Sequence, residues 1–397
     1  MRSRELRRML RERPAERELP ARERAWEVVR AAHARRSPAP SRRRSFRMAA
    51  AGIAAVALIG LVLSPAGGAV RDWVEEVIDP GVERAAPSLT EVPGGGRLAV
   101  EASDGPWVVE SDGSKRFLGE YDAAAWSPRG LFLAVAAGPS LAAVEPDGDP
   151  RWTIPTPGPI RSPRWAPTGV RVAYLSAGAL GVVAGDGTGD RVLDRRVAAV
   201  APAWAPERED GSASAGPTPA HLLAYVDSDG AVRLIEADTG KERWATAPVR
   251  ERALQLAWSS AGRKLHLLTA GGIRTYSSGG REVERRGSAN GAVGTVMSAA
   301  PTGDAVAVIS RDPARNRSHL SIRRGDAERE LFSGPGRFTG VTWSPTGEWL
   351  LLEWRDADQW LFIRPASGKV RAVSRISRQF DLGATKQRFP RVAGWCC

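Results

Sequence analysis

A short motif recurs along the C-terminal three quarters of the chain and limits what the chain can fold into. In full it reads Trp, a small residue, Pro, any residue, Gly, as in Trp343–Gly347. The first residue of each copy, here called the Trp position, recurs at intervals of 39 to 54 residues. The Trp positions are Trp126, Trp165, Trp204, Trp258, Ala299, Trp343 and Trp395. A period near 40 is typical of propeller-like arrays, so the sequence predicts a ring of similar units.

The residues around the motif predict a four-stranded unit. Ser-Pro-x-Gly suits a type I turn, with Pro pre-set at the second position and Gly at the fourth. Short apolar runs flank this turn, and later pairs such as Asp186-Gly187 and Thr239-Gly240 follow. Asp-Gly between apolar runs is a strong hairpin signal. Each unit is therefore expected to be an antiparallel meander of about 40 residues, which is one propeller blade.

The chain supplies seven such units only if its two ends share one. Residues 97–120 hold three strand-like runs with no motif before them. The missing first strand stands at the other end, in Arg388–Cys397, with Trp395 at the Trp position. Pairing the two ends would remove the exposed edges. We therefore predict an all-β fold over residues 97–397, a seven-bladed propeller closed by pairing of its terminal strands, with six blades as the alternative.

Residues 1–47 form a separate basic segment. They hold 16 Arg and 6 Glu, a net charge of +10 out of +12 for the whole chain. The remaining 350 residues are nearly neutral, so we expect no nucleic-acid binding by the folded part. Helical patterns interrupted by Pro predict a basic cytoplasmic helical segment and linker. It would lie on an anionic lipid surface or dock a cytoplasmic partner.

Residues 48–70 are free of charged side chains. As a helix they would span about 34 Å, enough to cross a bilayer. The flank before them is strongly basic and the flank after them is net acidic, which places the N-terminus in the cytoplasm. We predict a single-pass signal anchor in the cell membrane, a short juxtamembrane helix and linker over residues 71–96, and an extracytoplasmic propeller. A cleaved twin-arginine signal around Arg43-Arg44 is the alternative, with the same outcome for the propeller.

The sequence offers no set of residues for catalysis. No Gly-x-Ser-x-Gly elbow is present, and the histidines are scattered, so each is interpreted as a structural residue. They are His33, His221, His266 and His319. The recurring Trp residues are predicted to pack between blades and not to form a ligand platform. We accordingly predict no enzyme activity and no catalytic, cofactor-binding or metal-binding residue.

The only two cysteines, Cys396 and Cys397, are adjacent at the end of the chain. Their spacing matches neither a disulfide framework nor a Cys-x-x-Cys metal pair. We favour the interpretation that they simply end the last strand. A vicinal or intermolecular disulfide is the alternative, in an oxidising compartment.

Through its Trp-Ser-Pro-x-Gly turns and Asp-Gly hairpins, the region 97–397 resembles the WD40-like/TolB-type propeller repeats of bacterial envelope proteins. The resemblance implies a scaffold whose loops bind an extracytoplasmic protein or small ligand around a central channel. Ala299 in place of Trp and the insertion Glu207–Pro219 depart from the repeat and imply a weaker or decorated blade edge.

Two further resemblances give alternative functions. The layout of basic tail, single span and outer domain is similar to that of membrane-bound anti-sigma factors of actinobacteria, which implies a transmembrane regulator with a propeller sensor. The stretch Asp238–Trp244 resembles the repeat of quinoprotein-type propellers, which implies a quinoprotein-like or glycan-active enzyme. The expectation we carry forward is a membrane-anchored, extracytoplasmic binding scaffold or sensor that needs no cofactor.

Overall fold

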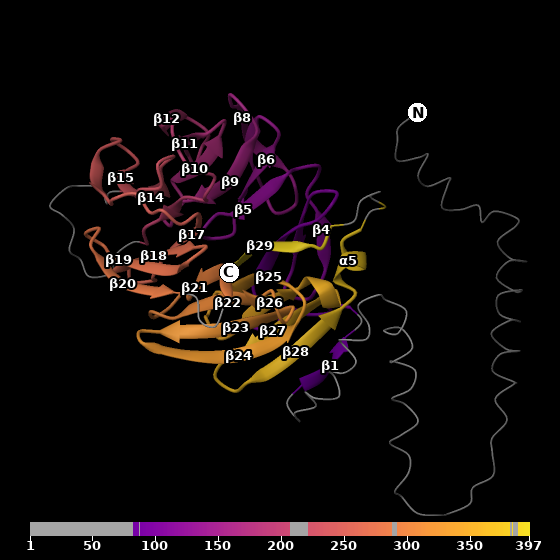
Figure 1. The fold of residues 1–397 in the computed structure, drawn as a ribbon. Helices are drawn as coiled ribbons and strands as arrows, with labels where there is room; N and C mark the ends of the chain where they lie inside the picture. The colour runs from indigo at the N-terminus through magenta and orange to yellow at the C-terminus, as the bar shows by residue number, and fades with distance from the viewer. Residues whose placement is uncertain (1–81, 87, 207–220, 288–291, 382, 384–387) are drawn as a thin grey trace, which may run out of the picture. The chain divides into compact units, whose positions relative to one another are not determined.

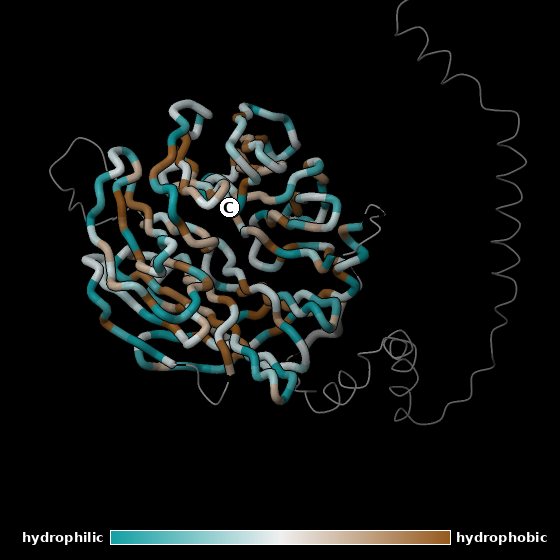
Figure 2. The backbone as a smooth tube through the Cα atoms, turned by 45° about the horizontal axis from the view of Figure 1, so that its top comes forward, coloured by the Kyte–Doolittle hydropathy of each residue, from teal (hydrophilic) through white to brown (hydrophobic). Residues whose placement is uncertain are grey.

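A computed structural model describes residues 82–86, 88–206, 221–287, 292–381, 383 and 388–397. The described residues are almost entirely β-structure, arranged as seven sheets that are antiparallel apart from one added strand (Figure 1). Hydrophobic residues follow the strands inside the body, and hydrophilic residues gather along the turns at its periphery (Figure 2). Each sheet is one blade, and its strands are given below from the innermost outward.

The first four blades include the one that joins the two ends of the chain. Blade 1 consists of β29 (Arg391–Cys396), β2 (Arg97–Glu101), β3 (Pro106–Val109) and β4 (Lys115–Phe117). Blade 2 consists of β5 (Ala123–Trp126), β6 (Leu133–Ala137), β7 (Ser140–Val144) and β8 (Pro150–Pro155). Blade 3 consists of β9 (Ile160–Trp165), β10 (Arg171–Ser176), β11 (Ala179–Ala184) and β12 (Arg191–Asp194). Blade 4 consists of β13 (Ala203–Trp204), β14 (Leu222–Val226), β15 (Val232–Glu236) and β16 (Glu242–Ala245).

The remaining three blades complete the ring. Blade 5 consists of β17 (Ala253–Trp258), β18 (Lys264–Thr269), β19 (Gly272–Ser277) and β20 (Glu282–Gly287). Blade 6 consists of β21 (Val293–Ala299), β22 (Val306–Asp312), β23 (Arg317–Arg324) and β24 (Ala327–Pro335). Blade 7 consists of β25 (Phe338–Trp343), β26 (Leu350–Trp354), β27 (Gln359–Arg364) and β28 (Lys369–Ser374), with β1 (Val82–Ala86) outside β28. Two short helical turns are η1 (Arg355–Ala357) and α5 (Ile376–Gln379).

The ring is closed, as predicted. The innermost strands contact one another in the order β29, β5, β9, β13, β17, β21 and β25, and β25 contacts β29 again. Strand β29 pairs antiparallel with β2, with Leu98 opposite Trp395. Seven blades are therefore confirmed, and the six-bladed alternative is wrong. Because the last strand of the chain completes the first blade, blade 1 depends on residues about 290 positions apart.

Strand β1 was not predicted. We expected a short helix and a linker over residues 71–96, but residues 82–86 pair parallel with β28. Ser374 Oγ donates to the carbonyl oxygen of Ala86 (3.2 Å), and Leu89 N donates to Gln379 Oε1 (3.0 Å). The open outer edge of blade 7 recruits this segment, because an unpaired edge strand offers a row of free backbone groups.

The other predictions for the N-terminal part fall outside the described residues. These are the basic segment 1–47, the proposed membrane anchor 48–70 and the helix expected before residue 82. Among the residues that the structure describes, no helix combines the length and apolar character needed to cross a membrane.

The Trp residues of the motif pack between blades, as predicted. Five of the six side chains are buried, with Trp165, Trp258 and Trp343 each 8% exposed, and Trp126 is half-buried. The indole N–H groups of several reach the preceding blade in ring order, donating to the carbonyl just before its Trp position. The bonds are Trp204 to Arg164 (2.9 Å), Trp258 to Ala203 (3.1 Å) and Trp343 to Ser298 (3.0 Å). The motif thus supplies both the turn of one blade and the brace to its neighbour.

The seam between blades 5 and 6 lacks this brace, because Ala299 replaces Trp. Here the side-chain amide of Gln255 on β17 bonds in both directions to the backbone of Met297 on β21. Gln255 Nε2 donates to Met297 O (2.7 Å), and Met297 N donates to Gln255 Oε1 (2.9 Å). The seam therefore retains a polar contact between neighbouring innermost strands, from a different residue type.

Candidate functional site

The innermost strands have no partner strand on their inner side, so their edges line the centre of the ring. One side chain in each strand, the residue just before the Trp position, shows how this centre is filled. These residues are Ala125, Arg164, Ala203, Ala257, Ser298, Thr342 and Gly394. Six of the seven are small, and Arg164 alone is long and charged.

Local backbone geometry turns Arg164 away from the blade interface. Its neighbours Pro163 and Trp165 are buried, whereas Arg164 is exposed. Strand β9 carries a bulge at this point, where Tyr174 of β10 faces both Ser162 and Pro163. Ser162 has a φ of +51°, a conformation that L-residues other than Asn, Asp and Gly adopt rarely. Bulges of this kind change the direction of the following side chains.

A second arginine lies on blade 1. Arg391 begins β29, opposite Glu101 on β2. Arg391 Nη2 lies 2.5 Å and Nε 3.2 Å from Glu101 Oε2. Ala124 N of the next blade donates to Glu101 Oε1 (3.2 Å), so this carboxylate is held from two blades. The negative charge of Glu101 is the main cause that raises the pKa of Arg391.

The pKa of Arg164 depends on charged groups of blade 1. Loss of hydration lowers the pKa of Arg164, the nearby Glu101 opposes that shift, and the positive charge of Arg391 adds to it. Glu101 and Arg391 therefore both act electrostatically on Arg164. Arg164 is both solvent-accessible and partly desolvated, which is what a recess at the ring centre produces.

A buried glutamate borders the same region. Glu353 on β26 is 1% exposed. Its Oε1 accepts from Val392 N (2.7 Å) and its Oε2 accepts from Thr339 Oγ1 (3.1 Å). Burial raises the pKa of Glu353 to about 7, against the lowering effect of these hydrogen bonds and of Arg391. A Cβ on Gly340, its partner in β25, would lie within 2.4–2.5 Å of the carboxylate, so only glycine leaves room for Glu353.

We call Glu101, Arg164, Thr339, Glu353 and Arg391 the channel cluster. Its members come from blades 1, 3 and 7. Between the arginine-bearing strands β29 and β9 lies β5, which carries only alanine before its Trp. With Glu101 ionised and Glu353 near its pKa, the cluster carries a net charge between zero and +1 around neutral pH.

None of these residues was predicted as a site, and the histidines do not form one. His221 Nδ1 lies 2.5 Å from Asp238 Oδ2, His266 Nδ1 3.1 Å from Thr275 Oγ1, and His319 Nδ1 2.9 Å from Glu330 Oε2. The three histidines belong to blades 4, 5 and 6, and His33 lies outside the described residues. Among the described residues, no three or more His, Cys, Asp or Glu side chains are grouped to hold a metal.

The sequence did contain a signal for the cluster. Arg164 is the only long side chain directly before a Trp position, and Glu353 is a single acid inside the apolar run Leu350–Trp354. A charge in a strand that is otherwise buried is unusual unless the charge is paired. The sequence alone could not interpret this signal, because the blade order does not show which side chains of blades 1, 3 and 7 face the centre of the ring.

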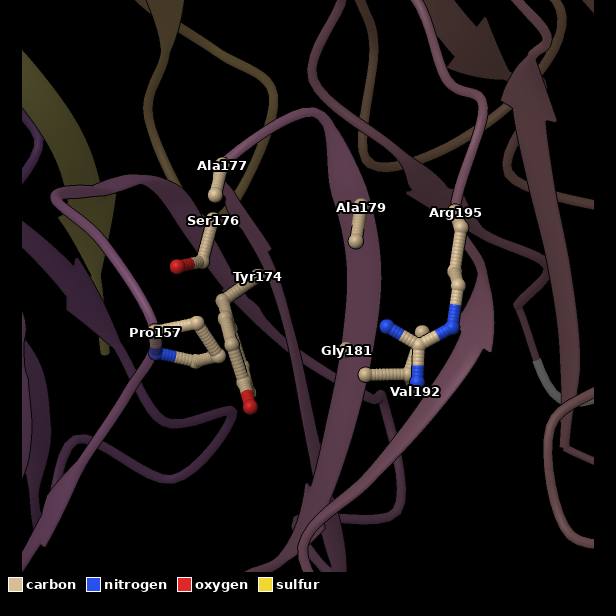
Figure 3. Close-up of a pocket in the computed structure, with 8 residues that line it drawn as sticks. All are labelled: Pro157, Tyr174, Ser176, Ala177, Ala179, Gly181, Val192 and Arg195. Carbon is tan, nitrogen blue, oxygen red and sulfur yellow. The ribbon is translucent and has the colours of Figure 1, made fainter.

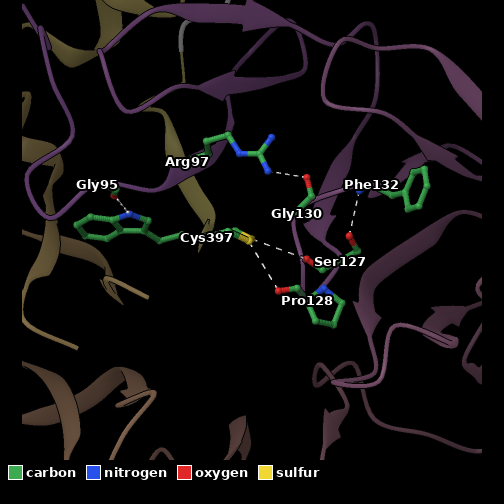
Figure 4. The surroundings of a disulfide bond; sticks show 9 residues. Gly95, Arg97, Ser127, Pro128, Gly130, Phe132 and Cys397 are labelled. Carbon is green, nitrogen blue, oxygen red and sulfur yellow. Dashed lines mark hydrogen bonds between the residues drawn. A yellow bond between two sulfur atoms is a disulfide. The ribbon is translucent and has the colours of Figure 1, made fainter. Parts of the chain in front are cut away.

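The cysteines are joined, so the interpretation of them as a plain strand end is wrong. Cys396 and Cys397 form a vicinal disulfide where β29 ends. Their sulfur atoms lie 3.8 and 3.7 Å from the carbonyl oxygens of Ser127 and Pro128 in the motif turn of blade 2 (Figure 4). Arg97 Nη2 donates to the carbonyl of Gly130 in the same turn (2.6 Å). Blade 1, which contains the closing strand, is therefore held against the motif turn of blade 2 by both of its inner strands.

A small pocket opens on blade 3 (Figure 3). Its volume is about 210 Å³, below the roughly 300–1,000 Å³ of typical ligand pockets. Tyr174 covers Gly181 and bonds Asp190 through its hydroxyl (2.5 Å). Ser176 Oγ donates to Gly158 O (2.8 Å). Because these polar groups are already bonded within the protein, the pocket is a weaker candidate than the channel cluster.

Comparison with known proteins indicates the fold alone. No family model matches the chain, and no curated protein matches it. Among solved structures, it is similar to the Cps50 (Swd1) β-propeller domain of Myceliophteria thermophila, at 13% identity and a TM-score of 0.49, over 64% of this chain and 85% of that one. It is also similar to Kuenenia stuttgartiensis hydrazine synthase, at 15% identity and a TM-score of 0.46, over 61% and 76%.

The class of protein follows from the topology. The chain is a seven-bladed β-propeller. Propellers of this class commonly serve as binding scaffolds.

Proposed function

We propose that this protein is a non-enzymatic binding scaffold or sensor that takes its ligand at the channel cluster. The observation that carries the proposal is Arg164, an exposed guanidinium at the ring centre where the six equivalent side chains are small. Functional side chains on rigid strands keep their geometry better than side chains on loops. The closed ring provides such a frame.

A binding role fits the cluster better than catalysis. Its two carboxylates are engaged by protein donors: Glu101 by Arg391 and Ala124 N, and Glu353 by Thr339 and Val392 N. Glu353 is also inaccessible, at 1% exposure. A general acid or base must come within hydrogen-bond reach of its substrate, and these two groups are occupied instead. The guanidinium groups remain as the accessible chemistry.

We further propose that the protein is anchored in the cell membrane by residues 48–70, with the propeller outside the cytoplasm. The support is the uncharged 23-residue stretch and the basic residues before it. Strand β1 is compatible with this arrangement, because it joins the chain leaving the proposed anchor to the edge of blade 7. In this arrangement residues 1–47 meet anionic lipid or a cytoplasmic partner.

Topology and binding can be tested separately. Alkaline phosphatase, which is active only after export, should be active when fused after Cys397 and inactive when fused after Arg47. Activity of the second fusion alone would contradict the extracytoplasmic assignment.

For binding, the full chain in detergent is screened against a metabolite library by thermal unfolding. At least one compound should raise the unfolding temperature of the native protein and not of Arg164→Met, and a screen in which no compound does so would count against a scaffold that uses this site.

A further inference from the structure

We infer that the seam between blades 5 and 6 is a pH-sensitive joint of the ring, where the buried imidazole of His266 takes the space that an indole fills at the other six seams. Protonation of His266 loosens the contact between β18 and β21. The inference concerns the ring itself and does not depend on a ligand of the channel cluster.

The residues that face the motif Trp side chains are apolar in the other six blades. In each of these blades, the second-strand residue opposite the one before the Trp position packs in the same cluster as the Trp of the next blade. The pairs are Ala99 with Trp126, Ala134 with Trp165, Ala173 with Trp204, Ala224 with Trp258, Ala307 with Trp343, and Leu351 with Trp395. The equivalent residue of blade 5 is His266, opposite Ala257.

Two exceptions to the repeat therefore meet at one seam. Blade 6 has Ala299 in place of Trp, and blade 5 has a large polar side chain at the position that faces it. Strands β18 and β21 are in contact. His266 is only 7% exposed although no indole covers it. Because protein interiors are close-packed, a buried imidazole at this position takes volume that the absent indole leaves.

This exchange leaves a polar atom without a partner. His266 Nδ1 lies 3.1 Å from Thr275 Oγ1, but His266 Nε2 has no hydrogen-bond partner among the described residues. At three other seams the indole N–H donates instead to the carbonyl before the neighbouring Trp position. A buried polar atom without a partner costs free energy that hydration would recover. Opening of this seam therefore gains hydration of the imidazole.

The surroundings keep His266 neutral while the seam is closed. Burial lowers the pKa of His266 to about 4. The positive charge of Lys264, on the same strand, adds to this effect, whereas the negative charges of Glu284 and Asp304 oppose it. Burial outweighs the two carboxylates, so a proton on His266 favours the open seam.

The strands packed against β18 present no second titratable side chain to His266. Strands β17 and β21 contain none. In β19, Arg274 and Tyr276 alternate with Thr275, which places them on the opposite face of the sheet. His266 is therefore the group through which pH acts on the contact between β18 and β21.

The direction of the pH effect follows from the two forms of the seam. Opening exposes His266 to solvent, where its ordinary pKa of 6.5 applies. Between about pH 6.5 and pH 4 the open form binds a proton that the closed form does not. The equilibrium constant for opening therefore rises by up to about tenfold for each unit that the pH falls. Below about pH 4 both forms are protonated, and the constant rises no further.

Hydrogen exchange of the full chain in detergent, followed by mass spectrometry from pH 4.5 to 7.5, measures opening strand by strand. Protection is corrected for the intrinsic exchange rate at each pH. Below pH 6.5, amides of β18 and β21 should lose up to about tenfold in protection per pH unit, whereas β6 and β9, at the seam of blades 2 and 3, should not. The readout is local because Glu353 changes global stability with pH in the opposite direction. Equal pH dependence at the two seams, or none at either, would overturn the inference.

A variant without a titratable group assigns the effect to His266. His266→Gln keeps a polar side chain that does not titrate, so β18 and β21 should be protected at pH 7.5 and lose the pH dependence. His221→Gln, which removes the histidine paired with Asp238 in blade 4, is the matched control and should keep it. Native-like pH dependence at the seam in His266→Gln would refute the joint.

A pair of variants tests whether the two side chains share one space. Ala299→Trp alone should destabilise the protein, because the new indole competes with His266 for the same volume. His266→Ala alone should destabilise it by leaving a cavity. The double variant restores the Ala–Trp pairing of the other seams, so its unfolding temperature should fall by less than the sum of the two single effects. A fall equal to that sum or larger would refute the exchange of His266 for the indole.

Discussion

At the scale of single residues, Glu353 couples the fold to pH. Burial raises its pKa to about 7 in the folded protein, from an ordinary value of 4.5. Between these two values the folded state holds a proton that the unfolded state releases. The contribution of Glu353 to the free energy of unfolding is therefore full below about pH 4.5 and decreases as the pH rises toward 7. Above pH 7 it changes no further, and the total loss is about 3 kcal/mol at most.

Glu353→Gln should flatten that dependence. The amide can accept from Val392 N and donate to Thr339 Oγ1, so both contacts of the carboxylate have a neutral counterpart. We expect native and variant proteins to have similar stability near pH 5, and the variant to be more stable near pH 8 by about 1–3 kcal/mol. Urea unfolding across this range is the measurement. An unchanged dependence of stability on pH in the variant would contradict the assignment to Glu353.

Gly340 gives a second prediction at this scale. An added Cβ would lie 2.4–2.5 Å from the Glu353 carboxylate, which is buried and cannot move into solvent. Gly340→Ala should therefore destabilise the protein by about 1–3 kcal/mol. Gly287→Ala is the control, because Gly287 also lies in a strand but has no atom within 4 Å of the added Cβ. Chemical denaturation of the two variants should separate them clearly, and equal midpoints would show that Glu353 has room to shift.

At the scale of elements, the braces between innermost strands rest on the indole N–H groups. Trp343 Nε1 donates to Ser298 O (3.0 Å) on the preceding blade, whereas the equally buried Trp165 Nε1 has no partner among the described residues. Trp343→Phe and Trp165→Phe remove similar volume. Only Trp343→Phe also removes a hydrogen bond, and it leaves the carbonyl oxygen of Ser298 without this donor. We expect Trp343→Phe to cost about 1–2 kcal/mol more in the free energy of unfolding. Equal costs would mean that the brace contributes only through packing.

At the scale of the whole molecule, closure by β29 should decide whether the ring forms. A chain of residues 88–397 keeps all seven blades and loses only β1, so it should remain monomeric and unfold cooperatively. A chain of residues 88–390 also loses β29, which exposes β2 and the open sides of two neighbouring blades. Exposed strand edges promote association, so this chain should aggregate or unfold at a much lower temperature. Size-exclusion chromatography and circular dichroism compare the two, and similar behaviour would show that closure is dispensable.

The sequence by itself determined the number of blades, their four-stranded form and the closure by Trp395. It could do so because turn chemistry and strand alternation are local, and the same local pattern recurs in every unit. The sequence did not predict strand β1, because the pairing of β1 depends on which sheet edge the folded ring leaves open. The disulfide was also undecided, because whether two adjacent cysteines can pair depends on the backbone conformation where the strand ends, which the sequence pattern does not give.

Only the tertiary structure decided the candidate site. Arg164, Glu353 and Arg391 lie in separate blades and far apart along the chain, and nothing local to each strand relates one of these charges to another. Closing the ring places them around one centre, where the buried carboxylate is paired with backbone donors and the guanidinium groups meet solvent. Electrostatic interactions depend on distance in space and not on separation in sequence, so this arrangement exists only once the ring has formed.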